Sequence, residues 1–213
     1  MDYKKLFHKE EAFQRETFQK RMEEFGFKNM ARMELFLWDL ELFLHIQKIL
    51  GDKIILKGGA ATQFYLPRDA QRTSVDIDML FFGTEEEIKE TLRKIEEYLG
   101  TEDELFYFHK HSPKNPKTNL PLHTYYTKVP SVLSNAERNM DRESIPYQEL
   151  KIEFILQPEK WEYERRTGEN IFAVNSSWNY QILPLNYLFA DKLTTLGCNT
   201  IGVQNERLDE QVK

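Results

Sequence analysis

Two short segments of the sequence decide how the chain is expected to fold: Leu-Lys-Gly-Gly-Ala-Ala at residues 56–61 and Arg-Thr-Ser-Val-Asp-Ile-Asp at residues 72–78. The first ends a β-branched run at a Gly-Gly turn, after which a helix restarts. The second begins a strand over residues 74–82, in which alternation places Asp76 and Asp78 on one face and apolar residues on the other. A strand, a glycine turn, a helix and a second strand with paired carboxylates predict a sheet packed by helices.

Helical patterns lie on both sides of these segments. Apolar residues at helical spacing predict an amphipathic helix or helix pair over residues 2–25, a more buried helix over 30–50 and a capped helix over 85–99. Further along, the pattern predicts a strand over 150–156 and a helix over 185–196. The expected fold class is therefore α/β (α+β): a small mixed, twisted sheet flanked by helices, with further helices before it.

Other stretches show no regular pattern. Residues 101–146 contain five prolines, and between Leu105 and Ala136 there is no Asp or Glu. This acid-free part, residues 105–136, is expected to be an irregular basic insertion. It could be a solvated connector, or it could guide RNA or triphosphate, with tyrosines stacking on bases. A polar segment without predicted elements precedes the last helix, and residues 198–213 form a polar tail.

Composition narrows the classes of function. The chain has 213 residues, with 29 Lys+Arg, 35 Asp+Glu and a net charge of −6, which excludes a uniformly basic protein that coats nucleic acid but not a local basic patch. Its single cysteine, Cys198, excludes an intramolecular disulfide or a zinc knuckle. No apolar run is long enough to span a membrane, and the charged N-terminus has no apolar signal region. We therefore expect a cytoplasmic protein without a membrane partner.

The glycine turn and the paired aspartates point to the chemistry. At Gly58 and Gly59, exposed backbone N–H groups could hold phosphate oxygens, because a Cβ there would block the approach of a ligand. Asp76 and Asp78 repel each other unless a cation neutralises them, and carboxylate oxygens suit Mg²⁺ or Mn²⁺. Glu153, on another alternating strand, could complete a three-carboxylate cluster. A phosphate cradle beside metal-binding carboxylates is the equipment of nucleotidyl transfer.

Each of these residues also has a plainer interpretation. The aspartates could form a solvated strand edge, the glycines an ordinary turn, and Glu153 an amphipathic ion pair with Lys151. Likewise, Arg72 could be a surface residue, Ser74 could bond to backbone, and Lys192 could extend from an apolar helix face into solvent.

The same residues resemble a known family. Gly58-Gly59 followed by Asp76-x-Asp78 is similar to the signature of the DNA polymerase β-like nucleotidyltransferase superfamily. More closely, Lys-Gly-Gly followed by Arg-x-Ser-x-Asp-x-Asp resembles the AbiEii/AbiGii toxin family of nucleotidyltransferases. The resemblance covers roughly residues 30–82 and extends more weakly through the predicted strand at 150–156 and the last helix.

The resemblance implies a role for each motif residue. The nucleotide would contact six residues: Lys57, Gly58, Gly59, Arg72, Ser74 and Lys192. Asp76, Asp78 and Glu153 would be the catalytic carboxylates and would hold Mg²⁺ (or Mn²⁺), with Glu153 aligning or activating the acceptor hydroxyl. Residues 51–197 would then form the nucleotidyltransferase domain, preceded by a helical segment at 1–50 packed on it.

The resemblance further implies a Mg²⁺-dependent transfer of a nucleoside monophosphate from an NTP to a hydroxyl acceptor, either an RNA or tRNA end or a protein. It implies a toxin of an abortive-infection or toxin–antitoxin system with a cognate antitoxin. Because the family usually continues with a helical C-terminal half and this sequence ends at Lys213, a fragment or a short relative is expected. Two alternatives stay open: a catalytically weak module that only binds nucleotide or RNA, and, more weakly, an Asp-x-Asp glycosyltransferase.

Overall fold

The computed structural model of the protein describes residues 2–112, 121–134 and 147–194. The predicted tail at 198–213, the end of the helix expected over 185–196 and parts of the acid-free segment lie outside these residues. Within the described part of the chain, seven strands form one sheet and five α-helices flank it, which confirms the α/β (α+β) class.

The sheet is mixed, with its strands in the order β3-β4-β5-β2-β1-β7-β6. β2 pairs with β5 and β1 pairs with β7 in parallel, whereas the other neighbours are antiparallel. The strands that carry the predicted site, β1, β2 and β5, are therefore neighbours in the middle of the sheet. The strands are β1 (Ile54–Lys57), β2 (Asp76–Phe81), β3 (His109–Lys110), β4 (Leu122–Pro130), β5 (Tyr147–Leu156), β6 (Glu164–Gly168) and β7 (Ser176–Ile182).

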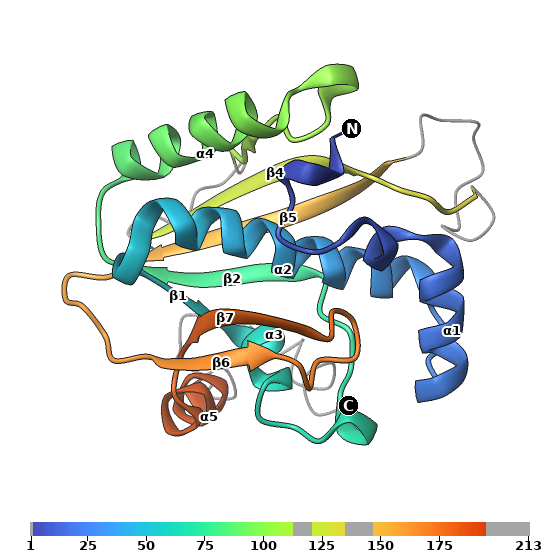
Figure 1. Ribbon diagram of the computed structural model, residues 1–213. Helices are drawn as coiled ribbons and strands as arrows, with labels where there is room; N and C mark the ends of the chain where they lie inside the picture. The colour runs from blue at the N-terminus through green and yellow to red at the C-terminus, as the bar shows by residue number, and fades with distance from the viewer. Residues whose placement is uncertain (1, 113–120, 135–146, 195–213) are drawn as a thin grey trace.

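The helices are α1 (Arg15–Phe25), α2 (Met30–Leu50), α3 (Gly58–Gln63), α4 (Glu85–Leu99) and α5 (Leu185–Thr194). α2 crosses one face of the sheet, and α4 lies beside it (Figure 1). α4 begins at a capping box in which Thr84 and Glu87 satisfy each other's backbone N–H groups, and it ends before Gly100 as predicted. In the described residues, no helix is long and apolar enough to cross a membrane.

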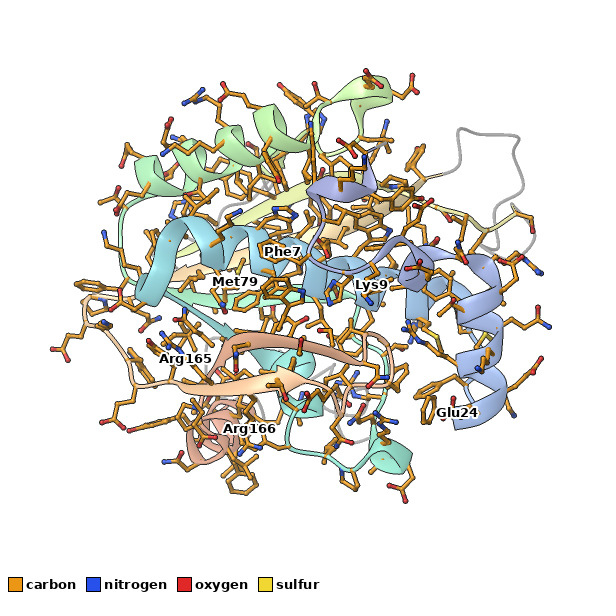
Figure 2. All side chains as sticks on the ribbon, viewed as in Figure 1. Phe7, Lys9, Glu24, Met79, Arg165 and Arg166 are labelled. Atoms are coloured by element: carbon orange, nitrogen blue, oxygen red, sulfur yellow. The ribbon has the colours of Figure 1, made fainter. Side chains whose placement is uncertain are left out.

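The first residues of the chain form only part of the amphipathic helix or helix pair that their pattern predicts. Over residues 2–25, only α1 is α-helical, and two 3₁₀ turns, Tyr3–Lys5 and Glu10–Phe13, precede it. This N-terminal segment (residues 2–14) lies along α2, where Figure 2 shows the Phe7 side chain. A continuous helix is interrupted there because the backbone N–H groups of Phe7 and His8 bond to the Glu41 side chain of α2.

Glu41 of α2 fastens the N-terminal segment. Its fully buried carboxylate accepts hydrogen bonds from the backbone N–H groups of Phe7 and His8 at 2.8 and 3.0 Å. It also bonds His8 Nδ1 at 2.6 Å and His45 Nε2 at 2.9 Å. The other ring nitrogen of His8 lies 3.0 Å from the hydroxyl of Tyr180 on β7. The network therefore joins the segment, α2 and β7 inside the core.

Alternation along β2, β4 and β5 separates the two faces of the sheet. On β2, Ile77, Met79 and Phe81 are completely buried on the side that α2 covers. The alternate residues of the three strands point the other way and stay partly exposed. We call that side the open face and define it by Asp76, Asp78, Thr124, Tyr126, Lys151 and Glu153.

Four strands are missing from the sequence prediction. Residues 101–146, expected to be irregular, contain β3 and β4, and the polar segment after β5 contains β6 and β7. β4 alternates correctly, with Tyr125, Thr127 and Val129 buried, but a polar threonine on its buried side conceals the pattern. The predicted strand at 150–156 is real and starts earlier, at Tyr147, because it pairs along its whole length with β4.

Candidate active site

Strand register brings the predicted carboxylates together. Asp78 of β2 lies opposite Lys57 of β1 on one side and opposite Glu153 of β5 on the other. Asp76 lies opposite Lys151 in the same parallel pairing. Directly paired residues of neighbouring strands project from the same face, so the four side chains of β2 and β5 are neighbours on the open face.

The glycine turn touches this row of side chains. Gly58 has a φ of +70°, and a Cβ added to it would collide with the Asp78 carboxylate, lying 3.0 Å from Asp78 Cβ. A Cβ added to Gly59 would lie 3.0 Å from Ser74 Oγ and 3.1 Å from Arg72 Nη2. Glycine is therefore required at position 58 by close approach and by its left-handed backbone, whereas a Cβ at position 59 would press on the Ser74 and Arg72 side chains. The structure therefore brings the turn, Asp78, Ser74 and Arg72 together, and their role as a site stays a prediction.

We expect Gly58→Ala to reduce any activity of this site by at least about a hundredfold and to destabilise the fold by about 1–3 kcal/mol. The added Cβ must displace the Asp78 carboxylate, and alanine is strained at this φ. Gly26→Ala is the matched control, because Gly26 has a φ of +71° but open space around it, so only the backbone strain is shared. Equal losses of activity in both variants would contradict the importance of the Asp78 contact.

The carboxylates hold negative charge in a poorly solvated place. Burial raises the pKa of Asp78 to about 7, and repulsion by Glu153 adds to the effect, while Lys57 opposes it. Burial also raises the pKa of Asp76, with Lys151 lowering it and Glu153 raising it. The two lysines therefore do not offset the cost of burying these charges, and a phosphate-bound cation would supply further countercharge.

Lys151 is a site residue that sequence reasoning treated only as an ordinary pairing partner. Its Nζ lies 2.9 Å from Glu153 Oε1, and the Thr124 hydroxyl donates to the same oxygen at 3.1 Å. The plainer interpretation of Glu153 as an ion-pair partner is thus present in the structure. The pair nevertheless lies beside Asp78 rather than at a remote strand edge, so it belongs to the site.

Helix α5 contacts the candidate site through Asp191, a residue that the sequence analysis did not predict. Asp191 of α5 lies 2.6 Å from the Nζ of Lys57, whose side chain is nearly buried. Lys57 therefore joins α5 to β1 and is directed to Asp191. Lys192, the predicted phosphate contact, follows it on an exposed part of α5. Asp191 stands at the helical spacing of the buried face of α5, and this spacing could have revealed it. Its pairing with Lys57 could not be predicted, because it depends on how α5 packs.

A second unpredicted carboxylate lies in α2. Asp39 is buried, and neither of its oxygens has a hydrogen-bond partner within the described residues. Burial raises its pKa well above the ordinary range, and the charges of Asp76 and Asp78 raise it further. Burial and the neighbouring aspartates therefore favour the neutral form of Asp39.

The donor set suits a hard divalent cation, although the side chains do not form a closed metal cage. Within the described part of the chain, no group of three or more His, Cys, Asp or Glu side chains is arranged to hold a metal ion. Glu153 is engaged by Lys151 and Thr124 instead. Mg²⁺ in nucleotide enzymes usually takes one or two carboxylates and completes its shell with substrate phosphates and water. Asp76 and Asp78 fit that requirement in chemistry and in charge.

A protein-family model now adds a finding that is independent of this geometry. The model described as "Nucleotidyl transferase AbiEii toxin, Type IV TA system" matches residues 42–207, which include every predicted site residue. The chain belongs to the AbiEii family. The resemblance found in the motifs is thereby confirmed at the level of the family.

Other comparisons add less. The crystal structure of JHP933 from Helicobacter pylori is similar to this AbiEii chain with a TM-score of 0.44 and 13% sequence identity. That comparison covers 96% of this chain and 65% of the other, so this chain spans 65% of that protein's length. A comparison with curated proteins gave no match.

Proposed function

We propose that this AbiEii protein transfers a nucleoside monophosphate from an NTP to a hydroxyl acceptor, releasing pyrophosphate. One observation carries the proposal: the register that sets Asp78 opposite Glu153, with the Gly58 backbone packed against the Asp78 carboxylate. A carboxylate row with a backbone turn beside it suits a triphosphate and its cation. Family membership supports the reaction class.

Separate residues would bind the triphosphate and the cation. Gly59, Ser74 and Arg72 form the part of the site that would receive phosphate oxygens, because the glycine leaves room and the guanidinium supplies charge-assisted donors. The six-residue α3 is too short to contribute a strong dipole, so this role rests on close approach and on Arg72. Asp76 and Asp78 would hold Mg²⁺ or Mn²⁺, which would neutralise phosphate charge.

Glu153 would act on the acceptor. Thr124 and Lys151 orient its carboxylate on the open face, where it can accept the proton of an attacking hydroxyl. The acceptor oxygen then forms a bond to the α-phosphorus, the α–β phosphoanhydride bond breaks, and pyrophosphate leaves with the electron pair. The proton ends on Glu153 and returns to solvent.

To test for transfer, the protein is incubated with each α-³²P-labelled NTP, with Mg²⁺ or Mn²⁺ and with total cellular RNA. A variant with both Asp76→Asn and Asp78→Asn is the control. We expect label to enter an acceptor only with intact aspartates, and the fraction that carries it distinguishes RNA from protein. Label transferred equally by the variant would contradict the site assignment.

NTP binding without transfer would instead favour a module that only binds nucleotide. This is the second candidate because Glu153, the proposed acceptor-activating residue, already forms an ion pair with Lys151. The glycosyltransferase alternative is not carried further, because the family is one of nucleotidyl transferases. We also propose, from the family alone, that the protein acts as a toxin with a cognate antitoxin.

A further inference from the structure

Four aromatic rings line the sheet edge next to the candidate site. Tyr107 and His109 meet edge to face, with ring centroids 4.5 Å apart and planes at 78°. His111 and Tyr126 form a second edge-to-face pair at 5.6 Å and 71°. We call Tyr107, His109, His111 and Tyr126 the aromatic platform.

Register places the platform in line with the carboxylates. Tyr126 of β4 lies opposite Lys151 of β5, which lies opposite Asp76, so the three occupy one row across the sheet. In the next row, Thr124 lies opposite Glu153, and the backbone N–H of His111 donates to the Thr124 carbonyl at 2.8 Å. Both rows project from the open face. The platform is therefore the outward continuation of the same surface.

The distance suits a short piece of an acceptor chain. Neighbouring strands lie about 4.8 Å apart, so β4 is about 5 Å and the edge strand β3 about 10 Å from β5, which carries Glu153. Stacked nucleotides advance about 3.4 Å each. A strand whose terminal hydroxyl lies at Glu153 would thus bring its next few bases over the platform.

The fold does not use these rings as core. Tyr107 is 45% exposed, both histidines are exposed, and Tyr126 is only half-buried, whereas the adjacent Tyr125 is 3% exposed. The sequence between Leu105 and Ala136, which supplies all four rings, contains no Asp or Glu that would repel a phosphate chain. Accessible rings on and directly beside two adjacent strands of an open sheet face resemble the arrangement with which sheet-based RNA-binding modules stack two or three bases.

We propose that the aromatic platform binds the single-stranded end of an RNA acceptor and directs its terminal hydroxyl to Glu153. The proposal rests on the proposed nucleotidyl transfer for the role of acceptor, but binding itself does not. A protein acceptor needs only one hydroxyl near Glu153 and gives no role to a row of rings that begins about 5 Å away, on the next strand, and continues to about 10 Å. The rings therefore favour RNA over protein.

The first measurement is direct binding. A fluorescein-labelled single-stranded RNA of about ten nucleotides is titrated with the full chain by fluorescence anisotropy, with a blunt duplex of the same sequence for comparison. We expect tighter binding of the single strand, and Tyr126→Ala and His111→Ala should each weaken it about ten- to a hundredfold. Tyr126→Phe keeps the ring and should retain most of the affinity. Tyr98→Ala on α4 is the matched control, because Tyr98 is 44% exposed but lies away from the open face.

The second measurement is label transfer with the same variants. A higher KM for RNA with an unchanged KM for NTP in Tyr126→Ala supports the platform as an acceptor subsite. Equal RNA affinity of wild type and Tyr126→Ala overturns it, even when transfer occurs. Label on protein without RNA binding also overturns it and leaves nucleotidyl transfer standing. Platform-dependent RNA binding without any transfer supports the platform and contradicts the proposed reaction.

Discussion

Asp78→Asn is expected to lower nucleotidyl transfer by about a thousandfold or more and, at the same time, to stabilise the protein without ligand. The loss follows because a neutral amide neither neutralises nor ligates a cation in the way a carboxylate does. The gain follows because the amide removes a buried charge that Glu153 repels. At pH 8 the free energy of unfolding should rise by roughly 1–2 kcal/mol.

The pH dependence of stability checks the same assignment. The folded state raises the pKa of Asp78 to about 7 from an ordinary value of 3.8, so it binds this proton more tightly than the unfolded chain does. The stability that the proton contributes is present below about pH 4 and is lost as pH rises to about 7. Wild type should therefore lose more stability than Asp78→Asn between pH 5 and pH 8. Asp39 and Asp76, whose pKa values are also raised, should leave part of the slope in the variant.

Urea unfolding at the two pH values measures the effect, with Asp69→Asn as the control for an exposed aspartate. Mg²⁺ or Mn²⁺ should raise the melting temperature of wild type at pH 8 and have little effect on Asp78→Asn. An Asp78→Asn protein that is less stable than wild type at pH 8 would show that the carboxylate is structurally satisfied. It would then be a poor candidate for a metal ligand.

Glu41→Leu is expected to destabilise the protein by about 3–5 kcal/mol, the largest effect on stability that the structure indicates. The substitution leaves two backbone N–H groups and two histidine nitrogens without their buried acceptor. Burial alone would raise the pKa of Glu41, but hydrogen bonds from His45 and His8 lower it to about 2. The stability of this network is therefore present above about pH 4.5 and lost as pH falls towards 2.

Urea denaturation at pH 7 measures the loss, and limited proteolysis should show earlier cleavage in residues 2–14. Glu97→Leu is the control, since Glu97 forms an exposed helix ion pair with Arg93 and should change stability by less than about 1 kcal/mol. Equal stability of the two variants would mean that the N-terminal segment contributes little to the fold. A loss confined to proteolysis would mean that it opens independently of the core.

The predictions from sequence succeed where a local pattern is strong. The helix at 30–50 has a dense apolar content and is buried on nearly every side, and the helix at 85–99 is bounded by the capping residues Thr84 and Gly100. At the site, the paired glycines are recognisable because they mark a tight turn, and the aspartates because they are unfavourable in a strand. Their convergence in the structure supports the local reasoning, while their roles stay predictions.

The features that the sequence did not predict depend on strand pairing and helix packing between distant parts of the chain, which no local pattern contains. β6 carries adjacent arginines at Arg165 and Arg166, and its identity as a strand follows from its pairing with β7 at the sheet edge. Lys151 becomes a site residue only through the register of β5 against β2, and Asp191 only through the packing of α5. The N-terminal segment departs from helix because Glu41, distant in sequence, accepts its backbone N–H groups.

The ion pair between Lys57 and Asp191 joins residues 134 positions apart in the chain. A ribosome adds about 5–20 residues per second, so roughly 7–27 seconds separate the synthesis of the two partners. Throughout that interval the glycine turn exists without α5 and, for most of it, without Glu153. A growing chain thus carries no assembled site for most of its translation.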